Sequence, residues 1–243
     1  MMKKIYGIGI LLTLSTLLVL GCGQKENTVR MATGGNTGTY YAYGTAIGQI
    51  LGEKENLRFN IQSTGASKAN IQLLDAGEVD LAIVQNDVLD YAYHGTDLFE
   101  ADGPVESLRA MAGLYAEVVQ IVASENSSIR SMEDLRGKRV SVGDAGSGVE
   151  FNAKQILMAY GIDFEDIQKQ NLGFSASADA LKDGKIDAFF ATAGAPTNAI
   201  MDLMTTQKIK LLSISEEKRQ SIAKAHPFYT TFTIVPGTYS GIS

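Results

Sequence analysis

The chain of 243 residues carries 27 acidic and 21 basic side chains, which gives it a formal charge of −6 at pH 7. Proteins that bind nucleic acid usually have a basic excess or a basic stripe, so this balance argues against such a partner. One cysteine and two histidines exclude an internal disulfide framework and a multi-thiolate metal site, and they leave little material for zinc or a His-dependent triad. An apolar share of 45% and 25 glycines suit a globular α/β protein of one large or two medium domains.

The amino-terminal segment has the pattern of a bacterial export signal. Two lysines precede an apolar stretch, residues 5–20, which is shorter than the roughly 20 residues that span a bilayer. The stretch ends at Gly21-Cys22, which resembles a lipobox with Cys22 as the lipidated first residue of the mature chain. A plain export signal with an unmodified Cys22 is the alternative. We expect a signal peptide over residues 1–21, a lipid-anchored tether over 22–27, and an extracytoplasmic location at the cell membrane, in the periplasm or on the outer face.

Two stretches of the sequence share the order strand, glycine-rich loop, helix. The expected strand, loop and helix span residues 28–32, 33–39 and 40–51, and again residues 139–142, 143–148 and 149–160. Gly161 follows the second helix in the position that favours a left-handed glycine. The repeated order indicates two α/β units of similar build.

A second pattern also occurs twice, as a helix end, a glycine and a short apolar run. Gly77 precedes the run 81–84, and Gly184, which lies 107 positions further on, precedes the run 188–191. The runs are continuous rather than alternating, which is typical of parallel strands covered by helices on both faces. Residues 111–122 form an unbroken strand-like passage, which we interpret as a crossover between two sheets.

In open parallel sheets, ligands bind beyond the carboxyl ends of the strands. The loops expected there are rich in Gly, Ser and Thr; they span residues 33–39, 63–67, 85–87, 143–148 and 192–196. Helix starts carry free N–H groups and a partial positive charge, so two of them facing each other across a cleft would clamp a small anion. For any single loop, turns and N-caps are the alternative interpretation.

No pattern typical of catalysis is present. The sequence lacks a GxSxG elbow, a GxxxxGK[ST] phosphate loop and an HExxH motif. Asp80 and Asp187 occupy equivalent places in the repeat and could form a carboxylate pair. Each of them, however, stands between a helix-stopping glycine and a buried strand, which is typical of a structural turn residue. We therefore expect no enzyme, no metal and no cofactor.

The loop sequences resemble the solute-binding subunits of TRAP transporters of the TAXI type (TRAP-associated extracytoplasmic immunogenic proteins). The resemblance rests on Ala32-Thr33-Gly34-Gly35, Gly38-Thr39-Tyr40-Tyr41, Ser63-Thr64-Gly65-Ala66-Ser67 with Asn70, Gln85-Asn86-Asp87, and residues 135–143 and 146–148. It implies an α/β, two-lobed periplasmic-binding-protein-like fold of type II with a parallel-core sheet in each lobe. Residues 28–118 with 230–243 would form lobe 1, and residues 119–229 would form lobe 2.

The resemblance also implies a binding function, in which no covalent bond is made or broken. The lobes would close, about residues 113–121 and 231–235, on a small carboxylate or amino acid that is glutamate-like, and deliver it to an ion-gradient-driven TRAP permease. The implied ligand contacts are Gly35, Thr37, Tyr40, Ser63, Ser67, Gln85, Asp87, Ser147, Gly148, Ala193 and Pro196. Asp87 would receive the amino group of an amino acid.

Three other interpretations stay open at this point. The same lobes could be the ligand-binding input of an extracytoplasmic sensor, or the binding protein of an ABC importer. A tetrapyrrole-building deaminase shares the scaffold but needs a cofactor-bearing cysteine in its cleft, and Cys22 lies in the export signal. Related chains usually run well past this length after a return crossover, which residues 232–236 resemble, so we expect the carboxyl-terminal part of lobe 1 to be missing.

Overall fold

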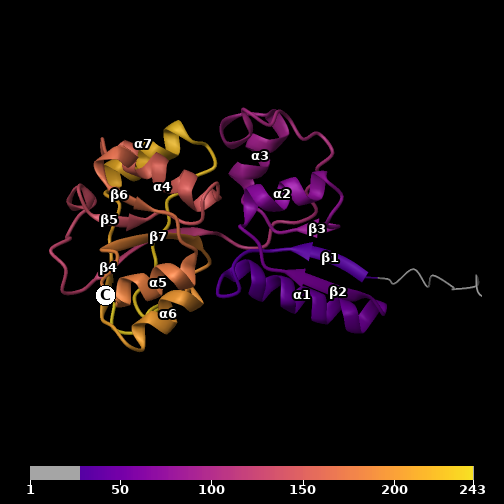
Figure 1. Cartoon of the computed structure of the whole chain (residues 1–243), viewed down its shortest axis with the longest axis horizontal. Coiled ribbons are helices and arrows are strands. Elements are labelled where there is room, and N and C mark those ends of the chain that lie inside the picture. The colour runs from indigo at the N-terminus through magenta and orange to yellow at the C-terminus, as the bar shows by residue number, and fades with distance from the viewer. Residues whose placement is uncertain (1–27, 243) are drawn as a thin grey trace, which may run out of the picture.

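In a computed structural model, which describes residues 28–242, the chain forms two α/β lobes side by side, each built around its own sheet (Figure 1). The expected signal peptide, the Cys22 lipidation site and the tether lie outside the described residues. Within the part of the chain that is described, no helix combines the length and the apolar character needed to cross a membrane.

Lobe 1 contains a three-stranded parallel sheet in the order β2-β1-β3. Its elements are β1 (Thr28–Ala32), α1 (Thr39–Glu55), β2 (Arg58–Gln62), α2 (Ser67–Asp75), β3 (Leu81–Ala82), α3 (Asn86–His94) and the 3-10 turn η1 (Asp97–Phe99). Helix α1 covers one face of the sheet, and α2 and α3 lie on the other (Figure 1). The predicted strand over residues 28–32 is confirmed, and the predicted helix over residues 40–51 forms the middle of a longer one.

Two glycines on α1 let its backbone lie directly against the sheet. Gly44 and Gly48 are one turn apart and buried. A Cβ on Gly44 would lie 2.7 Å from Cγ2 of Thr33, and a Cβ on Gly48 would lie 3.0 Å from Cβ of Phe59. Any side chain at either position would therefore push the helix away from β1 and β2.

We expect Gly44→Ala to lower the free energy of unfolding by about 1–3 kcal/mol, because overpacking outweighs the better helix propensity of alanine. Urea unfolding followed by circular dichroism measures this change. The exposed Gln49 of the same helix provides the control, since Gln49→Ala should change stability by less than about 0.5 kcal/mol. A Gly44→Ala variant as stable as the parent would contradict the close packing.

Lobe 2 contains a five-stranded sheet in the order β6-β5-β7-β4-β8. Its elements are β4 (Val118–Ser124), η2 (Glu133–Leu135), β5 (Arg139–Ser141), α4 (Gly148–Ala159), η3 (Phe164–Asp166), β6 (Gln168–Gln170), α5 (Phe174–Lys182), β7 (Ala188–Ala193), α6 (Asn198–Met204), β8 (Ile209–Leu211) and α7 (Glu216–Ala225). Strands β6, β5 and β7 form the expected parallel core, while β4 runs antiparallel to both of its neighbours.

The position of β7 between two cores explains why residues 188–191 are continuously apolar. Ala188 and Phe190 belong to the core cluster that includes α4 and α7, whereas Phe189 and Ala191 belong to the cluster that includes α5 and α6. Successive side chains thus enter cores on opposite faces of the sheet. The predicted coverage of this sheet on both faces is confirmed.

The duplication extends to one ion pair in each lobe. Asp80 accepts hydrogen bonds from Nε, Nη2 and the backbone N–H of Arg30, and its own N–H donates to the Arg30 carbonyl. Asp187 makes the same four contacts with Arg139. Each pair joins the residue just before one strand to a residue of the neighbouring strand, the middle of β1 for Arg30 and the first residue of β5 for Arg139. The structural interpretation of Asp80 and Asp187 is therefore confirmed.

Two expectations about the connections between the lobes differ from the structure. Within the stretch 111–122, strand β4 begins only at Val118; Met111 is 81% exposed and no strand lies beside the residues before Val118. The segment 232–236 is not a strand, and residues 232–242 pack on lobe 2 instead of lobe 1. Tyr239 is buried there, in the cluster of α5 and α6, and its hydroxyl accepts from the N–H of Thr197. The division of the chain at residues 118 and 119 stays a proposal.

The candidate binding cleft

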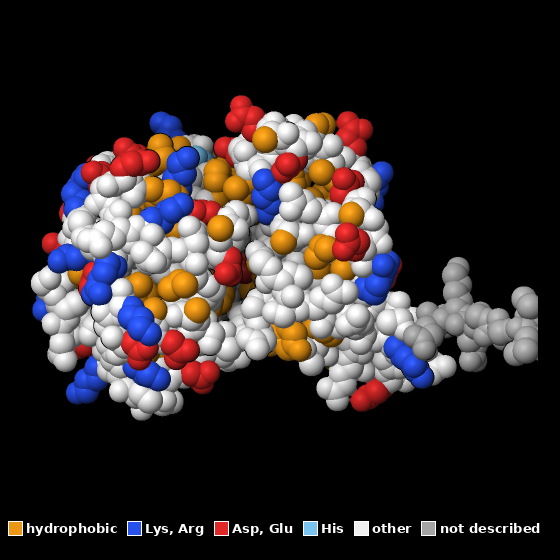
Figure 2. Space-filling model, viewed as in Figure 1, with side chains coloured by type: hydrophobic (Ala, Val, Ile, Leu, Met, Phe, Trp, Pro, Cys, Tyr) orange, Lys and Arg blue, Asp and Glu red, His pale blue; other side chains and the backbone are white. Residues whose placement is uncertain are grey.

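The loops that follow the strands of both sheets meet between the lobes, around a small cavity of about 50 Å³. Its lining residues are Gly34, Gly35, Gly38, Thr39, Tyr40, Ala66, Gln85, Glu117, Asp144, Ser147, Val149, Phe174, Thr192 and Ala193. The boundary between the lobes is visible as a groove on the surface (Figure 2). All five loops predicted to meet at the carboxyl ends of the strands contribute to this lining. The loop 63–67 contributes Ala66, and the loop 85–87 contributes Gln85.

A larger cavity of about 210 Å³ lies within lobe 2, between strands β4 and β8 and the segment 232–242. No lobe 1 residue lines it, and of the helices only α7 begins beside it. Movement of one lobe against the other would leave it unchanged. The smaller cavity is therefore the candidate site, because only that cavity is shared by both lobes and surrounded by helix starts.

Five helices begin at the cavity. Its lining includes Thr39, the first residue of α1, and Phe174, the first residue of α5, together with the N-caps of three other helices: Ala66 of α2, Gln85 of α3 and Ser147 of α4. The Ser147 side chain accepts from the N–H of Glu150, and neither α1 nor α5 has a side-chain cap. The first N–H groups of a helix have no partner within it, so these starts offer donors and partial positive charge from both lobes. This is the arrangement predicted from the loops, and it suits a small anionic group.

Glu117, which precedes β4, brings a carboxyl group to the same cavity. Its Oε2 accepts a hydrogen bond of 2.8 Å from the hydroxyl of Tyr40. Its Oε1 accepts none from the residues that the structure describes. Burial raises the pKa of Glu117 to about 8, and the hydrogen bond from Tyr40 only partly opposes that shift. In the empty cleft at neutral pH, the Glu117 carboxyl is thus mainly protonated.

A polar network centred on Asn152 of α4 connects the lobes beside the cavity. Its Oδ1 accepts from Nε2 of Gln85 at 2.8 Å and from the Thr192 hydroxyl at 3.0 Å. Its Nδ2 donates to Asp87 at 3.0 Å and to the Tyr229 hydroxyl at 2.7 Å. Gln85 and Asp87 belong to lobe 1 and the other two to lobe 2, so all four hydrogen-bonding positions of the amide are used, two toward each lobe.

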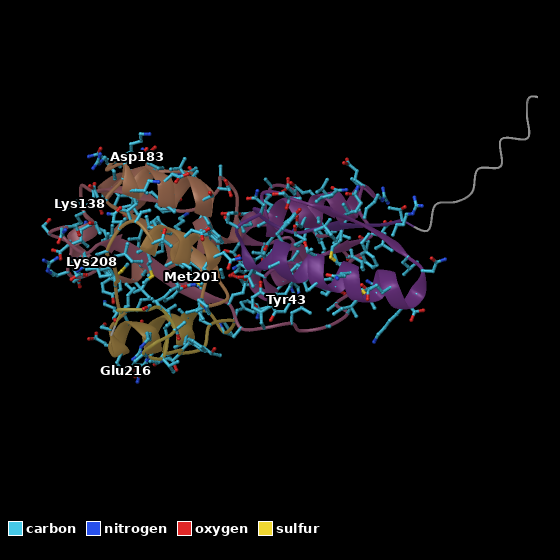
Figure 3. The ribbon with its side chains drawn as sticks, turned by 90° about the horizontal axis from the view of Figure 1, so that it is seen from below. Tyr43, Lys138, Asp183, Met201, Lys208 and Glu216 are labelled. Atoms are coloured by element: carbon cyan, nitrogen blue, oxygen red, sulfur yellow. The ribbon has the colours of Figure 1, made fainter. Side chains whose placement is uncertain are left out.

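Aromatic rings complete the contact between the lobes. The ring of Tyr91 on α3 lies 5.1 Å from that of Phe151 on α4 and 5.9 Å from that of Phe228, both in edge-on geometry. At the other side of the junction, Tyr43 of α1 lies on the end of lobe 1 that faces lobe 2 (Figure 3), and its ring is 4.6 Å from that of Tyr115. The lobes therefore touch through aromatic contacts at Tyr91, and Tyr43 packs on the connection between them.

The predicted contact residues divide into two groups. Gly35, Tyr40, Gln85, Ser147 and Ala193 line the cavity, whereas Thr37, Ser63, Ser67, Asp87, Gly148 and Pro196 do not. Of the second group, Ser67 lies behind the lining and accepts from the Gln85 N–H, while Ser63 and Pro196 are exposed. Asp87 is buried against Asn152 and the Val88 N–H, which differs from the expectation that it would meet an amino group. For the first group, the role in binding stays a prediction.

Sequence reasoning missed three lining residues that lie outside the predicted loops and contacts, Glu117, Val149 and Phe174. Glu117 lies in the passage that we interpreted as one apolar strand, where a lone acid among apolar residues was the available signal. Phe174 follows Gly173 at a helix start, in the same strand, glycine and helix order that marked the other loops. Among the described residues, no three His, Cys, Asp or Glu side chains gather closely enough to hold a metal ion.

Two α/β lobes with a shared cavity at their helix starts define the two-lobed fold of periplasmic binding proteins. Residues 31–243 match the NMT1-like family, and the chain belongs to that family.

Solved structures of periplasmic binding proteins share the fold. The periplasmic aliphatic sulphonate binding protein SsuA from Escherichia coli is 19% identical with a TM-score of 0.51, over 77% of this chain and 56% of that one. An ancestral arginine-binding protein bound to glutamine is 17% identical with a TM-score of 0.52, over 78% and 79%. The binding protein component of an ABC phosphonate transporter from Pseudomonas aeruginosa is 13% identical with a TM-score of 0.54, over 82% and 73%. The chain thus spans little more than half of the Escherichia coli protein.

We expect the stability of the protein to fall as pH rises from about 4.5 to about 8, through the buried carboxyl of Glu117. In that window, folded Glu117 keeps a proton that the unfolded chain has released, so rising pH favours unfolding. Glu117→Gln removes this dependence, and its stability relative to the parent should increase by up to roughly 1.4 kcal/mol for each pH unit across the window. Urea unfolding at a series of pH values measures the difference.

Glu125, exposed at the opposite end of β4, provides the matched control. Glu125→Gln should leave the pH dependence of the parent in place. A Glu117→Gln variant whose stability runs parallel to that of the parent at every pH would contradict the burial of this carboxyl.

Proposed function

We propose that this protein is an extracytoplasmic, lipid-anchored solute-binding protein that captures a small carboxylate or amino acid, glutamate-like in size, between its lobes. The observation that carries the proposal is the cavity lined by helix starts from both lobes. Such starts bind an anionic group through backbone N–H donors and need no arginine or lysine. Binding would then be coupled to closure of the lobes, with no bond made or broken.

The size of the cavity supports a moving cleft. About 50 Å³ is well below the cavity of about 150 Å³ that admits benzene in an engineered protein core. A solute as large as glutamate therefore needs more room than the empty, closed cleft offers. The lobes would open to admit it and would close around it in a slightly wider form.

One glycine controls how closely the lobes approach. Gly148, the first residue of α4, lies against the side chain of Gln85 from the other lobe, and a Cβ on Gly148 would stand 2.7 Å from Cδ of Gln85. The same Gln85 side chain donates to Asn152 in the network between the lobes. A methyl group at position 148 would therefore displace Gln85 and break a contact that exists only when the lobes are closed.

We expect Gly148→Ala to shift the protein toward an open form, with a larger radius of gyration in small-angle X-ray scattering of the solute-free protein. Loss of one hydrogen bond of about 1 kcal/mol corresponds to a roughly fivefold change in the ratio of closed to open molecules. Gly65→Ala is the matched control, because a Cβ there meets nothing nearer than 3.8 Å. Equal scattering from the parent and from Gly148→Ala would contradict this role.

The experiment that tests capture is thermal unfolding with glutamate, glutamine, 2-oxoglutarate, succinate and sulfate, each added separately. A solute present at 100 times its dissociation constant stabilises the folded protein by about 2.7 kcal/mol, which raises the midpoint by several degrees. We expect one or more of the carboxylate-bearing solutes to do so. A cooperative transition that none of them moves would contradict the proposal.

The permease partner is proposed on the loop sequences. Their resemblance to TAXI subunits favours a TRAP-type permease driven by an ion gradient. A second candidate is an ABC importer, because two proteins of similar structure are the binding components of ABC transporters, one for an amino acid and one for phosphonate. Uptake of a labelled solute into membrane vesicles from the source cells separates the two, since an ion gradient without ATP suffices only for the first.

A further inference from the structure

The ionisable groups that line the cleft do not suit a purely anionic solute. Glu117 and Asp144 are the ionisable acids among the lining residues, and neither lysine nor arginine is present there. The helix starts can balance one negative group. A second negative group on the solute would find no cationic partner and would hold Glu117 in its neutral form, and a sulfonate or phosphonate with no other charge would likewise leave Glu117 without an ionic partner.

Glu117 is the acid with an unused acceptor. Tyr40 donates to its Oε2, and its Oε1 accepts nothing from the residues that the structure describes. Glu117 is half-buried at the cavity wall, so its Oε1 can accept a hydrogen bond from a donor on the solute. Asp87, the residue that the sequence suggested for this role, already accepts from Asn152 and from the N–H of Val88 and does not line the cavity.

The helix starts and Glu117 give the cavity lining two opposite preferences. The helix starts supply N–H donors, and Glu117, which accepts from the Tyr40 hydroxyl, supplies a further acceptor. A molecule that carries an acid group and an ammonium group a few bonds apart satisfies both preferences together. Charge-assisted hydrogen bonds of this kind are shorter and stronger than neutral ones.

We propose that the solute is a zwitterion, an amino acid or an amino-substituted sulfonate or phosphonate, and that Glu117 binds its ammonium group. This inference rests on the proposed function, because it describes the solute of the same cleft. Glu117 would make the protein selective for amine-bearing solutes over their amine-free counterparts. The helix starts would bind the acid group that both kinds of solute carry.

Ionisation of Glu117 accompanies binding. The protonated carboxyl of the empty cleft releases its proton to solvent as the ammonium arrives, and the carboxylate that remains pairs with the ammonium charge. The other titratable groups that face Glu117 are Tyr40 on α1, Asp87 on α3, Tyr115 in the connection between the lobes and Asp144 across the cavity. Burial raises the pKa of both tyrosines above the ordinary value for tyrosine, so they stay neutral near pH 7.

The test is isothermal titration calorimetry with three matched pairs of probes. They are glutamate with glutarate, 2-aminoethanesulfonate with ethanesulfonate, and 2-aminoethylphosphonate with ethylphosphonate. In at least one pair, we expect the amine-bearing member to bind the parent protein at least tenfold more tightly than its counterpart. Glu117→Gln should remove that difference, whereas Glu125→Gln should keep it.

A second measurement on the parent protein does not depend on any variant folding. Titrations at pH 7 in buffers of different ionisation enthalpy count the protons released, and we expect close to one per amine-bearing solute bound. Glu125→Gln is the control, because this release should persist in it and disappear in Glu117→Gln.

The outcomes separate the inference from the function on which it rests. Tight binding of an amine-free member, equal binding within every pair, or amine selectivity that survives in Glu117→Gln would overturn the role of Glu117 and leave solute capture standing. If neither the six probes nor the solutes of the thermal panel bind, both proposals fail. Binding of amine-bearing probes without proton release would also overturn the inference.

Discussion

The closed arrangement of the lobes depends on the contact between Asn152 and Asp87. Asp87 is a carboxyl group buried at the junction, and burial raises its pKa. Its side chain retains hydrogen-bonding partners there because Asn152, from the other lobe, donates to it while accepting from Gln85. Without this amide, a buried acceptor would be left unpaired, at a cost of about 1–3 kcal/mol. The cavity exists only when the lobes are closed, so the geometry of the site follows from this one contact.

Parallel connectivity explains why the site lies where it does. Each strand of the parallel cores runs into a loop and then a helix, so the helix starts gather at the carboxyl edges of the sheets. The two lobes turn these edges toward each other, which concentrates the N–H donors of five helix starts, those of α1 to α5, around one cavity. Acidic residues complete the lining, so that backbone groups supply the positive character and side chains the negative.

The repeated sequence patterns predicted most of the fold. Continuous apolar runs and helix-stopping glycines located β3 and β7, because these features are local consequences of burial and backbone conformation. The loops around the cavity were predicted for the same reason. The role of Glu117 could not be predicted, since its importance arises from contact with Tyr40, 77 positions away in the sequence. The position of residues 230–242 depends likewise on the distant partners of Tyr239, which no local pattern encodes.

In the part of the chain that the structure describes, the backbone passes from one lobe to the other once, through the exposed residues before β4. These residues are mostly exposed, so the connection itself places little constraint on the direction of closure. That direction is guided instead by the surfaces that meet. The hydrogen bonds of Asn152 and the edge-on rings at Tyr91 act as that guide, so a variant at either place should affect the accuracy of docking as well as its strength.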